Sequence, residues 1–458
     1  ALNNKTGDAG LKLYYDTLVA DTDPLANLSQ FNHPGKTFGT FADFAYWNPS
    51  IDAKMFAVEV GNGEGGIGSG GYFPSFGEYT KALDKGWHVG PSNNQDNHKG
   101  YWGNSNTART VIFTDELSTG GILRGMKARS MYATEDKNLN IQYTLNDQIM
   151  GSIINDIPTS PLKFVLNIDD TDKDDNISKV EIVTNGGRVV KSESFNSNVV
   201  NMEFELPVAK GYYYVRVTQA DKNIAVTAPV WIGNAAIMGI TSVECDTIMP
   251  VTNEELSIDT KIFNNEKTDA TIKSITYSMN DVVLETKTPN TVVSPLGTVK
   301  ESFKFTPNKA GIVMLNVSVV LTLDGEDKEF SQGVELNIRD SEKLVYVGID
   351  ASHYNEYVDG NYKDSMGNFA NMATDYDVRV VELKTSEELI NATNNPKYKM
   401  LVLTPPTRRN GNGFLVGYKS YSDDEIAAVA TFAASGGTVI LTGWGDYYES
   451  YKNFTDGP

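Results

Sequence analysis

Cysteine is almost absent from this sequence of 458 residues, in which Cys245 is the only one. A single cysteine excludes an intrachain disulfide and a metal site built from cysteine thiolates. Long apolar runs are missing as well, since no stretch approaches the roughly 18 consecutive apolar residues of a membrane-spanning helix. We therefore expect a chain without a membrane span, whose domains each bury a hydrophobic core.

Basic residues are few compared with acidic ones. The chain has 39 Lys and Arg against 59 Asp and Glu, a formal net charge of −20. Such a charge repels polyanions and argues against a strong nucleic-acid-binding surface. An initiator Met and a signal peptide are also lacking, so we expect a mature or shortened piece of a longer protein. The acidic composition, rich in Asn, Thr and Tyr, is typical of bacterial secreted or cell-surface proteins.

The length favours about three domains, and in the first of them strands alternate with helices as far as Arg129. This alternation is typical of parallel βα units. Four residues able to bind a metal fall at or just after the C-terminal ends of the predicted strands: His33, Glu59, Asp96 and His98. In a barrel of parallel strands that end carries the catalytic residues. The four residues are therefore candidates for one shared site.

Asp96 and His98 form the most informative pair. They lie two residues apart after the strand-forming run Gly86–Val89, and side chains at that spacing in extended backbone point to the same side. A carboxylate and an imidazole that converge in this way suit Zn²⁺, Mn²⁺ or Fe. By itself the pair is weak, because a turn Asp beside a solvent-exposed His gives the same pattern.

A glycine-rich segment follows the second predicted strand. Residues Gly61–Gly66 match the G-x-G-x-x-G pattern of dinucleotide-binding loops. That pattern must open a helix at once, whereas three further glycines and Pro74 come first here. We therefore expect a flexible lid over the strand ends instead of a cofactor loop.

Four short motifs together resemble the PHP (polymerase and histidinol phosphatase) family of metal-dependent phosphoesterases. They are Asn32–Gly35, Phe56–Gly63, Gln95–Gly100 and Tyr132–Asp136. The resemblance implies the C-terminal half of a distorted (β/α)7 barrel over residues 1–157. It implies His33, Asp96 and His98 as ligands of divalent transition metals (Zn, Mn or Fe). It also implies catalytic roles for Glu59, as an acidic partner, and for Arg109, which would meet substrate charge.

The resemblance departs from the family at its beginning. The N-terminal His-x-His pair of PHP proteins is absent, and the first histidine here is His33. The chain is therefore expected to begin inside the barrel. It would need the missing N-terminal half of the barrel as a partner and would be inactive without it.

Beyond Lys137 the pattern changes to short alternating strands. Residues 158–234 predict a β-sandwich, and residues 235–340 predict a second one that resembles adhesion-type spacer domains. In the first of these, Asp169–Asp175 places oxygen ligands at every second residue, which suits Ca²⁺. The run lacks the glycine and the terminal Glu of an EF-hand loop, so we favour a solvated acidic turn.

The βα alternation returns over residues 341–458. This region resembles the class I glutamine-amidotransferase-like, or flavodoxin-like, α/β domains and is expected to be incomplete. Amidotransferase activity is excluded because it needs a nucleophilic Cys and Cys245 lies elsewhere. His353, just past a predicted strand, is interpreted as a surface or binding residue. The predicted fold class is thus multidomain α/β plus all-β, with a partial barrel, two β-sandwiches and a C-terminal α/β domain.

Two functional hypotheses follow from these patterns. The leading one is a secreted or cell-surface metal-dependent phosphoesterase, in which metal-activated water attacks a phosphorylated small molecule or a phosphodiester. The alternative is a non-catalytic cell-surface protein that binds glycan or a protein partner. Only the first hypothesis needs tightly bound transition metal.

Overall fold

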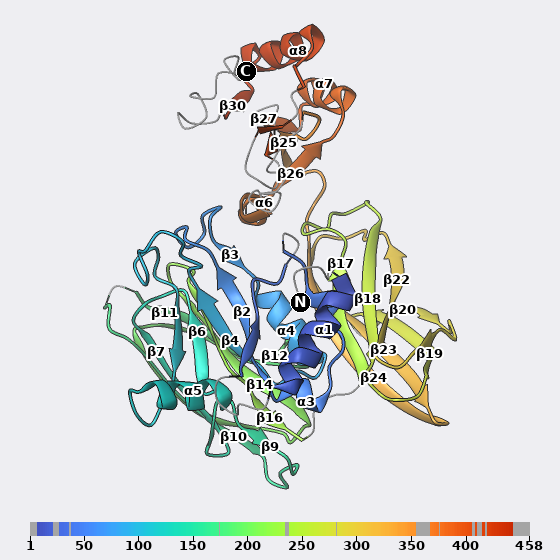
Figure 1. Cartoon of the computed structure of the whole chain (residues 1–458). Helices are drawn as coiled ribbons and strands as arrows, with labels where there is room; N and C mark the ends of the chain where they lie inside the picture. Colours follow the sequence, from blue (N-terminus) through green and yellow to red (C-terminus); the bar gives the residue numbers. More distant parts are fainter. Residues whose placement is uncertain are drawn as a thin grey trace. The chain divides into compact units, whose positions relative to one another are not determined.

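The computed structural model describes residues 7–21, 27–35, 38–173, 175–233, 238–280, 282–353, 367–374, 376–404, 408–409, 415–416 and 419–442. The chain forms two compact units (Figure 1). The first comprises Ala1–Glu244, Ser257–Phe303 and Val313–Glu335. The second comprises Cys245–Leu256, Lys304–Ile312 and Leu336–Pro458. No helix among the described residues is long and apolar enough to cross a membrane.

The first unit begins with a small, mostly parallel sheet. Its strands are β1 (Ser29–Phe31), β2 (Met55–Asn62) and β4 (Gly90–Asn94), with β2 in the centre and β3 (Phe73–Pro74) antiparallel to the end of β2. The run from Met55 to Val60 is apolar except for Glu59, and every residue of β2 is buried, as expected of a central parallel strand. The helices of this region are α1 (Gly7–Ala20), α2 (Phe41–Phe44), α3 (Pro49–Asp52), α4 (Phe76–Asp84) and α5 (Thr119–Lys127).

The pairing of these strands is not that of a PHP barrel. In the described residues the parallel part stops at β1, β2 and β4, and the next strands, β5 (Arg109–Ile112) and β6 (Met131–Thr134), pair antiparallel in another sheet. Strands make up 47% of the chain and helices 17%, so the molecule is mainly β. The predicted PHP-type barrel is therefore wrong. Its motifs describe strand ends and loops, whereas closing a barrel depends on long-range pairing that these motifs do not specify.

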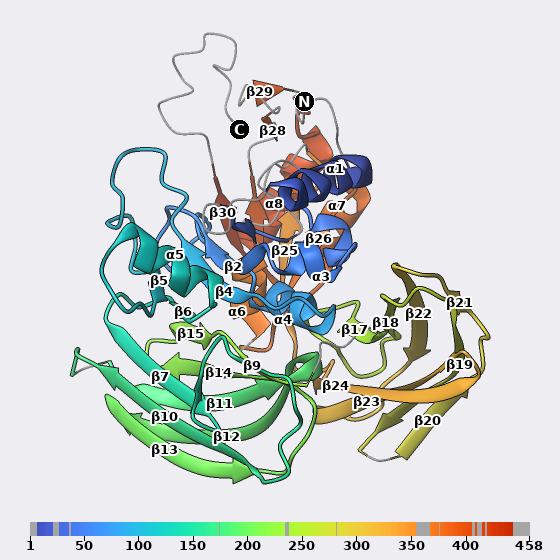
Figure 2. The ribbon, with the colours of Figure 1, turned by 60° about the horizontal axis from the view of Figure 1, so that its bottom comes forward.

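A β-sandwich follows, and its two sheets are visible in Figure 2. One sheet has the order β13-β10-β7-β8 and the other the order β12-β11-β14-β15-β6-β5, with β16 paired to β14 and β9 paired to β16. Burial alternates along β7 and β10, and large apolar side chains from both sheets form one core. The strands are β7 (Leu139–Leu145), β8 (Gln148–Ile149), β9 (Ile153–Ile154), β10 (Leu162–Asp170), β11 (Ile177–Thr184), β12 (Arg188–Ser197), β13 (Val199–Leu206), β14 (Gly211–Gln219), β15 (Ile224–Thr227) and β16 (Val230–Ile232).

The sandwich includes strands that precede residue 158. β6 pairs with β15 and β7 pairs with β10, so the chain passes from one sheet to the other between Thr134 and Leu139. Asn185 and Gly186 lie in a short 3-10 segment, Asn185–Gly187, that joins β11 to β12. Gly186 has a φ of 73°, a conformation that glycine adopts without strain.

Residues 238–338 form a second all-β region, in agreement with the prediction. Its sheets have the orders β17-β18-β22 and β20-β19-β23-β24, and β21 also pairs with β19. Ile272, Leu315, Val317 and Val319 are fully buried, because alternate residues of β19 and β23 face the core. The strands are β17 (Met238–Cys245), β18 (Leu256–Asn264), β19 (Ala270–Met279), β20 (Val282–Lys287), β21 (Val292–Val293), β22 (Gly297–Phe305), β23 (Gly311–Leu323) and β24 (Glu326–Ile338).

The second unit contains a parallel sheet of order β26-β25-β27-β30. Helices α7 and α8 contact each other, and each begins with a capping box, Thr385 with Glu388 and Ser422 with Glu425. The elements are β25 (Val345–Asp350), α6 (Gly367–Thr374), β26 (Val378–Leu383), α7 (Ser386–Asn394), β27 (Tyr398–Leu403), β28 (Arg408–Arg409), β29 (Leu415–Val416), α8 (Asp423–Ala434) and β30 (Thr438–Leu441). Residues 443–458 of the predicted α/β domain lie outside the described residues.

Candidate binding site at the strand ends

The predicted site residues lie at one end of the small parallel sheet. Because β1, β2 and β4 are parallel, their C-terminal ends share an edge. His33 lies two residues beyond β1, Glu59 is in the second half of β2, and Asp96 and His98 follow β4. The sequence therefore placed all four residues at the same edge of the sheet.

Glu59 is buried there and its carboxylate is fully used by the chain. Its side chain belongs to a residue that is only 3% exposed. Oε2 accepts hydrogen bonds from the backbone N–H of His33 at 2.6 Å and from Asn62 Nδ2 at 3.1 Å, and Oε1 accepts one from Asn94 Nδ2 at 2.8 Å. A buried carboxylate is tolerated when donors of this kind replace water. Glu59 thus ties the ends of β1, β2 and β4 together.

His33, Asp96 and His98 do not gather around one point. The ring of His33 packs 4.4 Å from that of Phe38, whereas His98 Nε2 lies 3.2 Å from Asp96 Oδ1 on an exposed loop. Among the described residues, these three do not form a group of ligand atoms close enough to share an ion. The pairing of Asp96 with His98 is present, and the assignment of a transition metal to these residues stays a prediction.

The loop that carries Asp96 and His98 is held by its own side chains. Asn97 Oδ1 accepts hydrogen bonds from the backbone N–H groups of Lys99 and Tyr101, and Asn97 Nδ2 donates to Ser105. Gln95 Nε2 donates to the backbone carbonyl of Asn106 at 2.9 Å. These bonds fix the backbone locally, as Asx turns do.

Arg109 closes the same loop from its C-terminal side. Its guanidinium donates to the backbone carbonyls of Gly103, Asn106 and Ala108 at 2.7, 2.9 and 2.6 Å. The structure therefore shows Arg109 holding the loop backbone. The predicted catalytic role, contact with substrate charge, is left untested.

The glycine-rich segment after β2 is fastened to this loop. Asn106 Nδ2 donates to the carbonyls of Gly63 and Gly65 at 2.9 and 2.8 Å, and Glu64 accepts a hydrogen bond from the backbone N–H of His98 at 2.7 Å. That backbone bond is the main cause that lowers the pKa of Glu64. The segment predicted as a flexible lid is thus anchored at several points.

Two aromatic residues at the tip of the loop are exposed. Tyr101 is 66% exposed and Trp102 is 80% exposed. They are flanked by Gly100 and Gly103, both with a φ of 79°, so left-handed turns bound the exposed pair on each side. A Trp side chain this exposed is uncommon on the surface of a folded protein and often marks a binding site. Sequence reasoning missed this pair, although its signal was two adjacent aromatic residues between turn glycines.

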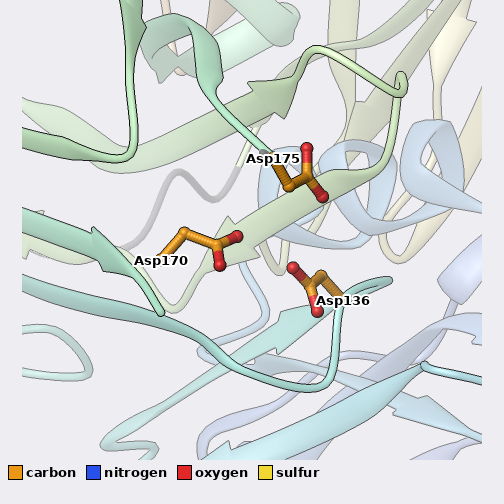
Figure 3. A group of neighbouring side chains, drawn as sticks. All are labelled: Asp136, Asp170 and Asp175. Carbon is orange, nitrogen blue, oxygen red and sulfur yellow. The ribbon is translucent and has the colours of Figure 1, made fainter. Parts of the chain in front are cut away.

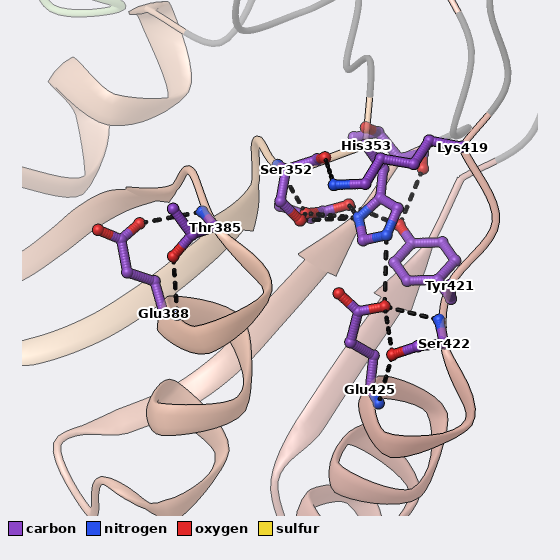
Figure 4. A network of polar contacts seen from close by, with 10 residues as sticks. Ser352, His353, Thr385, Glu388, Lys419, Tyr421, Ser422 and Glu425 are labelled. Atoms are coloured by element: carbon purple, nitrogen blue, oxygen red, sulfur yellow. Dashed lines mark hydrogen bonds and ion pairs between the residues drawn. The ribbon is translucent and has the colours of Figure 1, made fainter.

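A second polar network lies at the end of β25 in the other unit (Figure 4). His353 is fully buried, with Nδ1 3.0 Å from Asp350 and 2.8 Å from Ser352, and with Nε2 3.5 Å from Glu425. Burial opposes ionisation of Asp350, but hydrogen bonds from His353, Tyr421 and Ser352 outweigh it and lower the pKa of this carboxyl. The predicted surface position of His353 is therefore wrong, and its alternative interpretation as a binding residue stays a prediction. Glu425, from the capping box of α8, places its carboxylate close to the His353 imidazole. The strand pattern in the sequence could not reveal this contact.

Comparisons with known proteins leave the family open. No family model matches the chain, and no curated protein matches it. Among solved structures, a CARDB domain from Pyrococcus furiosus is 12% identical and covers 22% of this chain and 87% of its own, with a TM-score of 0.19. Red sea bream transglutaminase is 10% identical, and the match covers 57% of this chain and 45% of the transglutaminase chain, with a TM-score of 0.21. The C-terminal domain of Wzt is 12% identical, and the match covers 23% of this chain and 75% of the Wzt domain, with a TM-score of 0.20.

These neighbours are all β-rich, and none of them is a PHP protein or an amidotransferase. The resemblance to the PHP family is contradicted by the strand content and strand pairing described above. The amidotransferase-like assignment of the C-terminal domain is unsupported. What stands is a multidomain, mainly β protein with sandwich-like units.

Proposed function

We propose that the protein is a non-catalytic glycan-binding protein of the secreted or cell-surface class, and that Tyr101 and Trp102 make the main ligand contact. The observation that carries the proposal is the exposure of these two rings on a loop whose backbone is held by side-chain hydrogen bonds. Sugar rings present apolar C–H faces that stack on aromatic side chains and hydroxyls that need polar partners.

The surroundings of the aromatic pair fit such a ligand. Asp96 and His98 lie in the same loop. The Asp96 side chain is half exposed and the His98 side chain mostly exposed, so a ligand's hydroxyl groups can reach their polar atoms. The loop pays little ordering entropy on binding because Asn97 and Arg109 already fix it. The acidic surface as a whole favours a neutral ligand over a phosphorylated one.

Binding to insoluble polysaccharides tests the proposal. The chain should sediment with at least one of cellulose, chitin, xylan and peptidoglycan, and Trp102→Ala should reduce the bound fraction at least tenfold, with a smaller loss for Tyr101→Ala. Tyr376→Ala is the matched control, since Tyr376 is 73% exposed in the other unit. All three variants should keep the wild-type melting temperature, because surface substitutions cost within about 0.5 kcal/mol.

Two results would overturn the proposal. One is equal binding by wild type and Trp102→Ala on every polysaccharide that is bound. The other is hydrolysis of bis(p-nitrophenyl) phosphate by the purified chain with Zn²⁺ or Mn²⁺, which would show that the protein is catalytic.

A further inference from the structure

Three aspartates meet at one end of the first β-sandwich. Asp136 lies between β6 and β7, Asp170 is the last residue of β10, and Asp175 precedes β11. One carboxylate oxygen of each lies within 4.8 Å of one oxygen of the others, and the three side chains point toward one another in Figure 3. Asp170 is fully buried. The interpretation of this run as a solvated acidic turn is therefore wrong for Asp170, and Asp174 lies outside the described residues.

Gln219, the last residue of β14, adds an independent sign of a missing ligand. Its side-chain amide is 99% buried, and Nε2 lies 3.0, 2.6 and 3.1 Å from oxygens of Asp136, Asp170 and Asp175. An amide –NH₂ has two hydrogens, so it cannot donate to three carboxylates at once. All three acids thus direct an oxygen at the Gln219 amide nitrogen, which has too few hydrogens to donate to each of them.

Residues of the same group also carry oxygens without a hydrogen-bond partner. Gln219 Oε1, Asn138 Oδ1 and Asp175 Oδ1 are all buried and make no hydrogen bond in the described part of the chain. Each such atom costs about 1–3 kcal/mol when it is left without a partner. Asn138 belongs to the group because its Nδ2 donates to Asp170 at 2.9 Å. The site therefore holds more acceptor oxygens than the protein can satisfy.

We propose that this group binds one Ca²⁺ ion. Ca²⁺ takes six to eight oxygen ligands at about 2.3–2.6 Å, so two ligand oxygens on opposite sides of it lie about 4.6–5.2 Å apart, which matches the spread of the three carboxylates. Reversing the amide of Gln219, whose two orientations have the same shape, brings Oε1 to the ion. No histidine or cysteine belongs to the group, so a Zn²⁺ site is disfavoured.

The ion would join the two sheets of the sandwich. β7 and β10 belong to one sheet, and β6, β11 and β14 belong to the other. Asp136 comes from the segment that crosses between the sheets, Asp170 from one sheet, and Gln219 from the other. Bound Ca²⁺ is therefore a structural cross-link at this end of the sandwich, independent of the aromatic pair.

Thermal unfolding of the metal-free chain with and without Ca²⁺ tests the site. Addition of 1–10 mM CaCl₂ should raise the melting temperature of the wild type by several degrees, since a ligand that binds only the folded state stabilises it. Calorimetric titration should give one ion per chain. Asp170→Asn should lose the shift, whereas Asp169→Asn should keep it, because Asp169 is the exposed neighbour on the same strand. Trp102→Ala should also keep it.

Asp175→Asn serves as a second variant if Asp170→Asn fails to fold, because Asp175 is only half-buried. It too should lose the Ca²⁺ shift. A wild-type protein that shows no shift at 10 mM CaCl₂ would overturn the proposal. So would a shift that persists in both Asp170→Asn and Asp175→Asn.

Discussion

Three of the places where the first unit buries carboxylates differ in the groups that surround the acid. Glu59 receives three N–H donors from three residues. The three aspartates at the sandwich end crowd around the single side-chain amide of Gln219, and Asp136 and Asp170 accept further hydrogen bonds from Asn138 and from the backbone N–H of Asp172. Asp84 accepts hydrogen bonds from the backbone N–H of Gly186 and from the hydroxyl of Tyr212.

The number of carboxylates that meet at one place separates the sandwich end, with three, from Glu59 and Asp84, which each stand alone among their donors. A buried carboxylate is tolerated when hydrogen bonds replace the lost water, and Glu59 accepts three of them. When donors are too few, the charge must be met by a cation or removed by a proton. We infer that a cation meets the charge of Asp136, Asp170 and Asp175. At Asp84 a proton removes the charge, because burial raises the pKa of this carboxyl to about 8.

Removing the Glu59 carboxylate should have the largest effect. Glu59→Ala removes the shared acceptor of the His33 backbone N–H and of the Asn62 and Asn94 amides in a largely buried place, and each buried group left unsatisfied costs about 1–3 kcal/mol. We expect the free energy of unfolding to fall by about 3 kcal/mol or more, measured by urea denaturation. Glu205→Ala is the control, since Glu205 is exposed on β13. A loss below about 1 kcal/mol would mean that Glu59 does not hold the strand ends together.

Neutralising one aspartate of the sandwich-end group should have an effect whose sign depends on Ca²⁺. In chelator, Asp175→Asn removes one of three crowded negative charges, so its melting temperature should equal or exceed that of the wild type. With Ca²⁺ the variant lacks a ligand and should be less stable than the wild type by about 1–3 kcal/mol. A variant that is equally destabilised under both conditions would show that Asp175 has an ordinary structural role.

The sequence predicted local features of the fold more successfully than long-range ones. The strand ends that carry His33, Glu59 and Asp96 were placed at one edge, because the apolar run of β2 and the polar residues after it are local signals. The two all-β regions followed from period-2 patterning. The barrel was wrong because β5 and β6 pair antiparallel, and pairing between distant strands leaves no mark in a short motif.

The same limit applies to the sites. Asp170 and Asp175 stand in one acidic run, but Asp136 and Gln219 come from segments more than thirty residues away on either side, so only the folded sheets bring the four together. The spacing of the run suggested Ca²⁺, and the absent EF-hand residues argued against it. That argument applied to a ligand loop formed by one segment, whereas these oxygens come from the ends of two strands, β10 and β14, and from two connections.

Asp84 gives the smallest expected effect and the strictest test of the three settings. Its pKa in the folded state, about 8, lies above the ordinary value of 3.8. The folded state therefore keeps a proton that the unfolded state loses as the pH rises above about 4, and stability falls with pH until the folded state also ionises near pH 8. Asp84→Asn carries no proton to lose and can still accept a hydrogen bond from Tyr212. The variant should gain on the wild type by at most about 1.4 kcal/mol between pH 6 and pH 7, measured by urea denaturation at each pH. A constant difference between variant and wild type from pH 5 to pH 8 would show that Asp84 is ionised in the folded protein and is satisfied, like Glu59, by its hydrogen bonds alone.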